Sequence, residues 1–285
     1  MGTPSENARD FFWLAHEREI MAQKRERGEP WPWTKDYVLS NYRFCRIMRE
    51  DDKTTAWFRE NVRKPLTDLD EIMISTYVFR WFNSIRTGEV LLPELLNPFD
   101  IEKAREKLYA MPGPHFGSAY VIQSPTGMTK IDGVLWAIGN VTERWREGAE
   151  LCRTSRSLET VHAWLKQFPH MGPFMAYQVV CDLRYTHLLD HAEDKMTWTC
   201  AGPGAARGLS WLEHDEPEVF NYNGQKDQVI MMARMAELLD MSRDPQYWPM
   251  KDKPWELSTV QHWACEYDKW RRGHAGQRLK RTFHG

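Results

Sequence analysis

The sequence has few cysteines and no long apolar run. Its five cysteines are scattered and include no C-x-x-C pair. This spacing excludes a zinc ribbon and a disulfide framework, and favours a reducing, cytosolic compartment. No stretch is long enough to span a bilayer, and no charged segment followed by an apolar run stands at the N-terminus. We therefore expect a soluble protein with no membrane partner.

A strong positive charge is also lacking, since 38 Lys and Arg residues stand against 40 Asp and Glu residues, for a formal net charge of -2. This balance excludes a protein that coats nucleic acid through bulk charge, so any DNA contact must come from local basic patches. The densest patch is residues 269–283. We predict that it is a phosphate-contacting tail, with a disordered solubilising tail as the alternative. Its candidate DNA contacts are Arg271, Arg272, Lys280 and Arg281.

The chain reads as helices separated by proline and glycine. A capping box with proline at the first helical position predicts a helix from Thr3 to near Gly28. Apolar spacing predicts further helices and one short strand at residues 119–123. The helices are expected at residues 36–50, after Asp70 with apolar positions as far as Ile85, from Asn97, and at residues 131–145, 157–168, 227–241 and 257–272. The expected fold is mainly α with few short strands.

Residues 165–212 organise the rest of the chain. In the first half, apolar residues run into the turn Pro169-His-Met-Gly172 and resume at helical spacing directly after it. This pattern predicts two helices joined by a tight hairpin, whose second helix presents backbone N–H groups to a DNA phosphate. The candidate DNA contacts are His170, Met171 and Gly172. The second half, from Asp194 to Leu209, is predicted to be a glycine-rich loop carrying an acidic residue and Arg207.

The hairpin sequence resembles that of the helix-hairpin-helix DNA glycosylase superfamily, whose consensus is roughly Leu-Pro-Gly-x-Gly-x-Lys-x-Ala. His170 replaces the first glycine, and Phe174 stands where bifunctional members keep a Schiff-base lysine, which removes β-lyase chemistry. In that superfamily an essential aspartate follows the hairpin, and Asp194 lies 22 residues after Gly172. The resemblance implies a two-lobed helical fold.

A closer resemblance covers most of the chain and is to the alpha-glutamyl/putrescinyl thymine pyrophosphorylase family of phage-type amino acid:DNA transferases. The similar blocks are Gly2 to Arg9, Trp31 to Thr34, Tyr42 to Glu50, Gly202 to Leu209 and His262 to Lys269. The resemblance implies one glycosylase-like catalytic unit over residues 1–285. Its parts are a helical part (1–110), a turn-rich connector (111–150), the hairpin and loop (151–215), and the C-terminal helices with the basic tail (216–285).

What that family does defines the expected reaction. The resemblance implies thymine hypermodification, in which an amino acid or amine displaces phosphate or pyrophosphate from 5-hydroxymethyluracil that a kinase has phosphorylated in DNA. The implied partners are that DNA and the upstream kinase, and the implied co-substrate is an amino acid or polyamine. No metal cluster is expected from the residue spacing, although metal use stays open. We expect a monomer, acting in the host cytoplasm if it is phage-encoded.

The reaction assigns roles to particular residues. A flipped base would be held in a pocket that excludes water. A carboxylate or histidine must take the proton of the amine, and here Asp194 is the first candidate, before Glu266 and His262. Arg207 and the N–H groups near Gly202 and Gly204 suit the departing phosphate. Further substrate contacts are expected from Thr197, Trp198, Arg43, Arg46 and Lys269.

Simpler interpretations stand beside these. Asp194 could cap a helix, Gly202 to Gly204 could be an ordinary turn, and Arg43 and Arg46 could form a solvated face. His262, Glu266 and Lys269 could be the polar face of a helix. Two other functions remain open from the sequence, a monofunctional glycosylase that acts on a modified base and a non-catalytic DNA-binding module.

Overall fold

The computed structural model describes residues 4–117, 122–280 and 282–283, and helices make up most of this part. The mainly α prediction is confirmed. The few short strands are not found in the described ranges, where the pairing of Tyr42 with Thr282 is an isolated antiparallel bridge. Most of the strand predicted at 119–123 falls outside the described residues.

The chain divides into two compact units, and each is described by itself. Unit 1 consists of Met1–Asp51 and Lys195–Gly285, and unit 2 of Asp52–Asp194. The sequence-based division at residues 110, 150 and 215 follows neither boundary. The hairpin and the glycine-rich segment, which we treated as one stretch, belong to different units.

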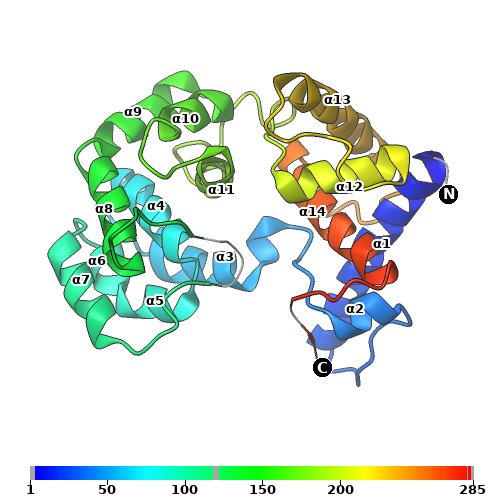
Figure 1. Cartoon of the computed structure of the whole chain (residues 1–285), viewed down its shortest axis with the longest axis horizontal. Coiled ribbons are helices and arrows are strands. Elements are labelled where there is room, and N and C mark those ends of the chain that lie inside the picture. Colours follow the sequence, from blue (N-terminus) through cyan, green and yellow to red (C-terminus); the bar gives the residue numbers. More distant parts are fainter. Residues whose placement is uncertain (1–3, 118–121, 281, 284–285) are drawn as a thin grey trace. The chain divides into compact units, whose positions relative to one another are not determined.

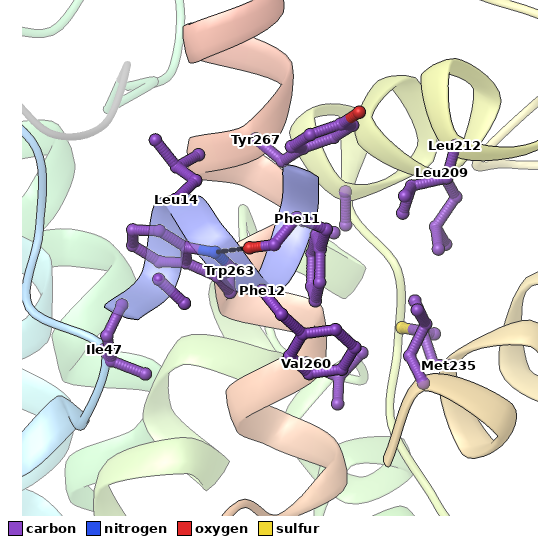
Figure 2. Packing of buried hydrophobic residues seen from close by; sticks show 14 of the residues in the cluster. Phe11, Phe12, Leu14, Ile47, Leu209, Leu212, Met235, Val260, Trp263 and Tyr267 are labelled. Atoms are coloured by element: carbon purple, nitrogen blue, oxygen red, sulfur yellow. Dashed lines mark hydrogen bonds between the residues drawn. The ribbon is translucent and has the colours of Figure 1, made fainter. Parts of the chain in front are cut away.

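Unit 1 is built around helix α14, against which α1, α2, α12 and α13 pack. The Nε1 atom of Trp263 in α14 donates a hydrogen bond of 3.0 Å to the carbonyl oxygen of Phe11 in α1, inside an apolar core (Figure 2). Both rings are fully buried. The helices of this unit are α1 (Pro4–Glu26), α2 (Tyr37–Asn41), η1 (Arg49–Asp51), α12 (Pro203–His214), α13 (Gln225–Met241) and α14 (Leu257–His274).

The predicted loop is non-helical as far as Gly202 but helical from Pro203, so the prediction is wrong for the segment that carries Arg207. Gly202 is the N-cap residue of α12 and Pro203 its first residue, and α12 packs along α14 (Figure 1). A Cβ at Gly208 would overlap the carbonyl oxygen of Ala264, and one at Gly204 would lie 3.1 Å from the Sγ of Cys265. The glycines therefore allow two helices to approach closely, and this packing explains them without a ligand.

Unit 2 is arranged around α4, all of whose residues are buried. The Nε atom of Arg80 in α4 donates to Asp182 Oδ2 in α11 at 2.6 Å, and both side chains are buried, so the pair ties the two helices together. Its helices are α3 (Lys53–Phe58), η2 (Arg59–Arg63), η3 (Leu69–Glu71), α4 (Ile72–Phe82), α5 (Ile85–Val90), α6 (Leu92–Leu95), α7 (Ile101–Ala110), α8 (Lys130–Thr142), α9 (Trp145–Ser155), α10 (Leu158–Leu165) and α11 (Pro173–Leu183).

Locally encoded helices were predicted well. The first helix, Pro4–Glu26, is followed by Gly28 in the left-handed conformation at φ 72°. The prediction of one helix over residues 36–50 is wrong, because the helix ends at Asn41 and an extended segment follows. The helix predicted to reach Ile85 stops at Phe82, where Asn83 takes a left-handed conformation with φ 45°.

Candidate functional site

The predicted hairpin is present in unit 2. Helix α10 ends at Leu165, and α11 begins at Pro173 with Gly172 as its N-cap. His170 lies in the left-handed region with φ 58°, at the position where the consensus has its first glycine. Met171 is buried, whereas His170 and Gly172 are exposed. The turn is thus anchored by Met171 and presents its two neighbours to solvent.

Gly172 has no role in packing the protein itself. Its φ of -67° and ψ of 170° are open to any residue, and a Cβ there would meet nothing within 4 Å. The first N–H groups of a helix have no partner within that helix, and the helix dipole adds positive potential at this end. The turn therefore offers a surface on which an external anion has room to approach the backbone.

A buried histidine fixes the start of α11. The Nε2 atom of His162 in α10 lies 2.9 Å from the carbonyl oxygen of Pro173, an acceptor, so Nε2 carries the proton and donates it. Burial lowers the pKa of His162 to about 4, with a further lowering by Lys166 and a partial offset by the bond to Pro173. The imidazole is therefore neutral at pH 7 and acts as a structural bridge between the two helices of the hairpin.

Aromatic and basic side chains flank the turn. The Trp136 ring in α8 is 42% exposed and lies edge-on to the His170 ring, with the centroids 6.0 Å apart. The guanidinium of Arg144 lies 5.4 Å from the centroid of Phe168 and also pairs with Glu147 at 2.6 Å. An exposed indole beside the turn is a surface on which an unstacked base can rest.

Asp194 caps a helix of unit 2. Its Oδ1 accepts the backbone N–H of Leu158 at 2.8 Å, and its Oδ2 accepts the hydroxyl of Ser157 at 2.8 Å and the N–H of Glu159 at 3.1 Å. These groups form the start of α10. The carboxylate therefore satisfies N–H groups that helix geometry leaves without partners, and the cap interpretation accounts for its position.

In unit 1, three predicted residues of α14 contact one extended segment, Tyr42 to Arg46. His262 Nε2 donates to the Arg46 carbonyl oxygen at 3.2 Å, and Glu266 Oε2 accepts the N–H of Cys45 at 3.1 Å. Lys269 Nζ donates to the Arg43 carbonyl oxygen. These bonds to the main chain hold the segment extended, which explains why it is not helical. The side chain of Arg43 itself is exposed.

Glu266 is ionised in this setting. Burial alone would raise its pKa, but Lys269 at 3.5 Å, His262 and hydrogen bonds from Cys45 outweigh that effect and hold the pKa below its usual value. Lys269 also lies 4.2 Å from the centroid of the Phe44 ring. The arrangement supplies a buried carboxylate beside a histidine, a combination able to accept a proton.

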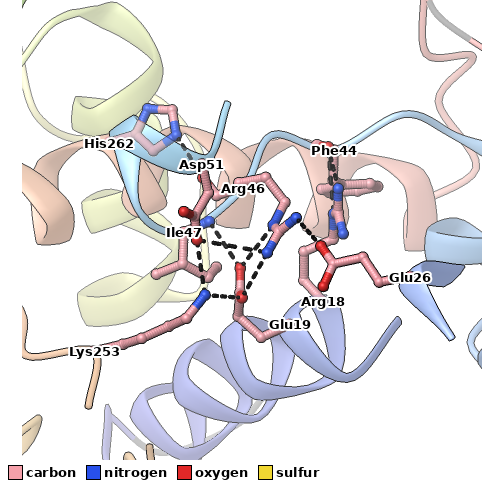
Figure 3. Close-up of polar contacts among 9 residues, drawn as sticks. All are labelled: Arg18, Glu19, Glu26, Phe44, Arg46, Ile47, Asp51, Lys253 and His262. Carbon is pink, nitrogen blue, oxygen red and sulfur yellow. Dashed lines mark hydrogen bonds and ion pairs between the residues drawn. The ribbon is translucent and has the colours of Figure 1, made fainter. Parts of the chain in front are cut away.

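Arg46 belongs to a network of ion pairs (Figure 3). Its Nε and Nη2 atoms each lie 3.2 Å from an oxygen of Glu19, and its Nη1 lies 3.0 Å from Glu26 Oε1. Lys253 Nζ contacts Glu19 at 2.8 Å and Asp51 at 2.7 Å. Because the Glu19 side chain is fully buried, the network anchors this segment to α1 and commits the Arg46 charge to neighbouring carboxylates.

The basic residues at the C-terminus do not form a free tail, because the helix α14 extends to His274. Arg271 pairs with Asp215, donates a hydrogen bond from Nη1 to the hydroxyl oxygen of Tyr267 at 3.1 Å, and lies 4.7 Å from the centroid of the Trp211 ring. Arg271 and Arg272 therefore lie on the helix predicted at residues 257–272, and their contact with DNA stays a prediction. Lys280 is exposed, and Arg281 lies outside the described residues.

The remaining predicted residues are dispersed within unit 1. Arg207 in α12 and Arg272 in α14 both contact Asp268. Trp198 is buried and Thr197 exposed. Sequence analysis missed Glu19, Lys253 and Asp268. The spacing of Asp268 and Arg272, four apart in a predicted helix, was a signal for one of these pairs, but nothing local marked Glu19 or Lys253.

Among the residues with assigned positions, no group of three or more His, Cys, Asp or Glu side chains is placed to hold a metal ion. Within the described ranges, none of the helices combines the length and the apolar character needed to cross a membrane.

Comparison with known proteins identifies the class to which this helical chain belongs. A family model described as "5-hmdU DNA kinase, helical domain" matches residues 5–278, and the chain belongs to this family. A relative is the "5-hmdU DNA kinase" of Bacillus phage SP10, which is 24% identical over 294 residues. The match covers 94% of this chain and 45% of the relative, so the chain spans less than half of that protein. No solved structure matches.

The matched family differs from the one that the sequence blocks resemble. The resemblance was to a thymine pyrophosphorylase family, whereas the family shown carries the name of a 5-hmdU DNA kinase. The name of the matched family refers to 5-hmdU in DNA, the nucleoside of the base on which the resembled family is expected to act.

Proposed function

We propose that this chain acts in the modification of 5-hydroxymethyluracil in DNA, and that the hairpin at residues 166–173 is the surface with which it holds the DNA. Membership of a family named for a DNA kinase of this nucleoside supports the choice of substrate. The phage relative with the same name supports it as well. The kinase reaction is part of the name of that longer relative, of which the match covers 45%.

One observation carries the assignment of the hairpin. His170, at the position of the first consensus glycine, has a left-handed φ of 58°, a conformation that glycine adopts without strain, and this supports a hairpin of the helix-hairpin-helix type. A non-glycine residue is strained in this region, which indicates a turn held in place by its surroundings. Gly172 keeps the approach to the α11 backbone open. A helix-hairpin-helix fold of the glycosylase type is accordingly our proposal for unit 2.

Substitution at Gly172 separates a role in DNA binding from a role in the fold. Gly172→Asp places a favourable capping side chain at the N-cap of α11, and should leave the thermal stability unchanged or higher. The same carboxylate occupies the place of a DNA phosphate, so affinity for duplex DNA containing hydroxymethyluracil should fall at least about tenfold. Gly172→Ala should also lower the affinity for DNA, but by less than Gly172→Asp.

The matched control is Thr154→Asp, which adds the same charge at an exposed position of α9. Fluorescence anisotropy at two salt concentrations measures both variants against the wild type. If Gly172→Asp binds as tightly as Thr154→Asp while both remain folded, the hairpin is not the DNA surface.

A second candidate function, which we propose on a separate observation, is transfer of an amino acid or amine to the phosphorylated base. Glu266, which lies one turn after His262 on α14 and faces the same segment, could take a proton from the attacking amine. In this reaction a C–N bond forms at the 5-methylene carbon, its C–O bond breaks, and phosphate or pyrophosphate leaves with the bonding electrons. Asp194 is less suited as the base, since both oxygens cap α10.

Mass spectrometry tests the transferase. Hydroxymethyluracil DNA treated with a 5-hmdU kinase is incubated with the protein and a mixture of amino acids and polyamines, and then digested to nucleosides. New 5-substituted deoxyuridines that vanish with Glu266→Gln support transfer. Unchanged nucleosides contradict it and leave the DNA-binding function in place, whereas abasic sites point to a glycosylase. A melting curve verifies that the variant is folded.

A further inference from the structure

Two arginines of unit 1 converge on one buried carboxylate. The Nε atoms of Arg207 in α12 and Arg272 in α14 each lie 3.1 Å from Oδ2 of Asp268. The Asp268 side chain is 1% exposed, while each arginine side chain is 30% exposed. The carboxylate is therefore at the base of the cluster and the guanidinium groups reach the surface.

Helix packing produces this arrangement. Gly204 and Gly208 let α12 lie close against α14 at Cys265 and Ala264, which brings Arg207 beside Asp268. Arg272 follows Asp268 by four residues and so lies on the same side of α14. The block from Gly202 to Leu209 thus positions its arginine through a contact between two helices.

The cluster carries excess positive charge, and some of its hydrogen-bond donors have no acceptor among the described residues. Two guanidinium groups face one carboxylate, which leaves one net positive charge. Each arginine contacts Asp268 through Nε, and within the described part of the chain the Nη atoms of both have no acceptor. Oδ1 of Asp268 is buried and receives no hydrogen bond, so neither guanidinium bridges both oxygens of the carboxylate. Neither arginine therefore makes the bidentate pair that would use up its planar fork.

We propose that Arg207 and Arg272, positioned by Asp268, bind a phosphate group. Guanidinium forks match the tetrahedral oxygens of phosphate, and two of them on a rigid carboxylate are oriented in advance. The phosphate is either free pyrophosphate or phosphate, the product class of the transfer reaction, or a phosphodiester of DNA. Binding of a phosphate group by the two arginines does not depend on the proposed function, whereas the choice between these two sources rests on it.

Isothermal titration calorimetry with inorganic pyrophosphate tests the free ligand. Arg207→Gln and Arg272→Gln should each weaken binding at least about tenfold. The control is Arg243→Gln, which removes the same charge from an exposed side chain of unit 1 that pairs with Asp240, and it should have less than a twofold effect.

Asp268→Asn distinguishes positioning from simple electrostatics. The variant raises the net charge by one, so charge alone predicts tighter binding of an anion. Positioning predicts weaker binding, because the amide no longer holds two guanidinium groups in place. If Asp268→Asn does not fold, Arg207→Lys makes the same test, since it keeps the charge but loses the fork.

The two sources give different results. Binding of pyrophosphate that depends on both arginines assigns the site to a free leaving group. No pyrophosphate binding, combined with weaker DNA binding and a shallower salt dependence in both variants, assigns it to the DNA backbone. The proposal is overturned when Arg207→Gln and Arg272→Gln match Arg243→Gln in both assays. That failure is separate from failure of the hairpin, which Gly172→Asp tests in the other unit.

Discussion

Lys253 Nζ lies 2.8 Å from Oε2 of Glu19, and this contact joins residues 234 positions apart in the chain. Glu19 is fully buried and is shared with Arg46. Replacing Glu19 by Gln leaves two partly buried cations without their common carboxylate. We expect unit 1 to lose about 3 kcal/mol or more of unfolding free energy, measured by urea denaturation. Glu26→Gln, at the exposed edge of the same network, should cost well under half as much.

The same carboxylate makes stability depend on pH. The pKa of Glu19 is lowered because hydrogen bonds and charges from Arg46 and Lys253 outweigh the opposing effect of burial. Its contribution is therefore complete above the unfolded-state pKa near 4.5 and is lost as pH falls through the lower folded-state value. Acid unfolding of Glu19→Gln should show a weaker pH dependence below 4.5. An unchanged slope would contradict the ionised state.

His162 predicts a second pH dependence, in unit 2. Because its pKa falls from 6.5 to about 4, the unfolded state binds the proton more readily, and stability should decline as pH drops from 6.5 towards 4. The maximum loss is about 3 kcal/mol. His162→Gln keeps a donor for the Pro173 carbonyl and should flatten this part of the curve. Melting temperatures between pH 4 and 8 provide the measurement.

Asp194 should affect stability. Asp194→Ala removes the acceptors for two N–H groups at the start of α10, and we expect a loss of about 1–2 kcal/mol. Asp194→Asn retains one strong acceptor and should lose less. Thermal unfolding measures both. If Asp194→Ala instead has the thermal stability of the wild type but no longer supports base modification, Asp194 is again a catalytic candidate.

Replacing two glycines by alanine should affect stability very differently. Gly208→Ala puts a Cβ onto the Ala264 carbonyl oxygen, so it should destabilise unit 1 by about 1–3 kcal/mol despite the better helix propensity of alanine. Gly172→Ala enters open space and should change stability by less than about 0.5 kcal/mol. Differential scanning calorimetry on both variants tests the contrast, and equal melting temperatures would refute the close packing.

Trp136 predicts a specific DNA contact. Its ring is half-exposed beside His170, so Trp136→Ala should cost little stability. If the indole stacks on an unpaired base, affinity for DNA with a single-stranded gap should fall by about 1–3 kcal/mol. The control Trp136→Phe keeps an aromatic face and should lose less. Equal binding by all three proteins would exclude stacking.

Local signals predicted the hairpin and the terminal helices. Proline at a first helical position, an N-cap and a steady apolar period act within a few residues, and they placed α1, α11 and α14. The extended segment before Arg46 was mispredicted because long-range partners decide its conformation. Its N–H and carbonyl groups bind His262, Glu266 and Lys269, and a sequence window does not contain those contacts.

The candidate site was harder to predict for the same reason. Gly204 and Gly208 have the composition of a loop, and only the contact with α14 shows that they allow helix packing. Asp194 had the spacing of a catalytic residue, yet its neighbours in space are the N–H groups of α10. Asp268 carries no mark in the sequence that distinguishes a buried anchor from a surface carboxylate.

The division of the chain into two units constrains the order in which the units fold. Unit 2 is continuous, whereas α1 of unit 1 finds its partners α12 and α14 after Lys195. On the ribosome, Phe11 and Phe12 leave the exit tunnel long before Trp263 is synthesised, so their apolar surface has no native partner while Asp52–Asp194 is completed. Unit 2 can fold during synthesis, and unit 1 must wait for release of its C-terminal helix.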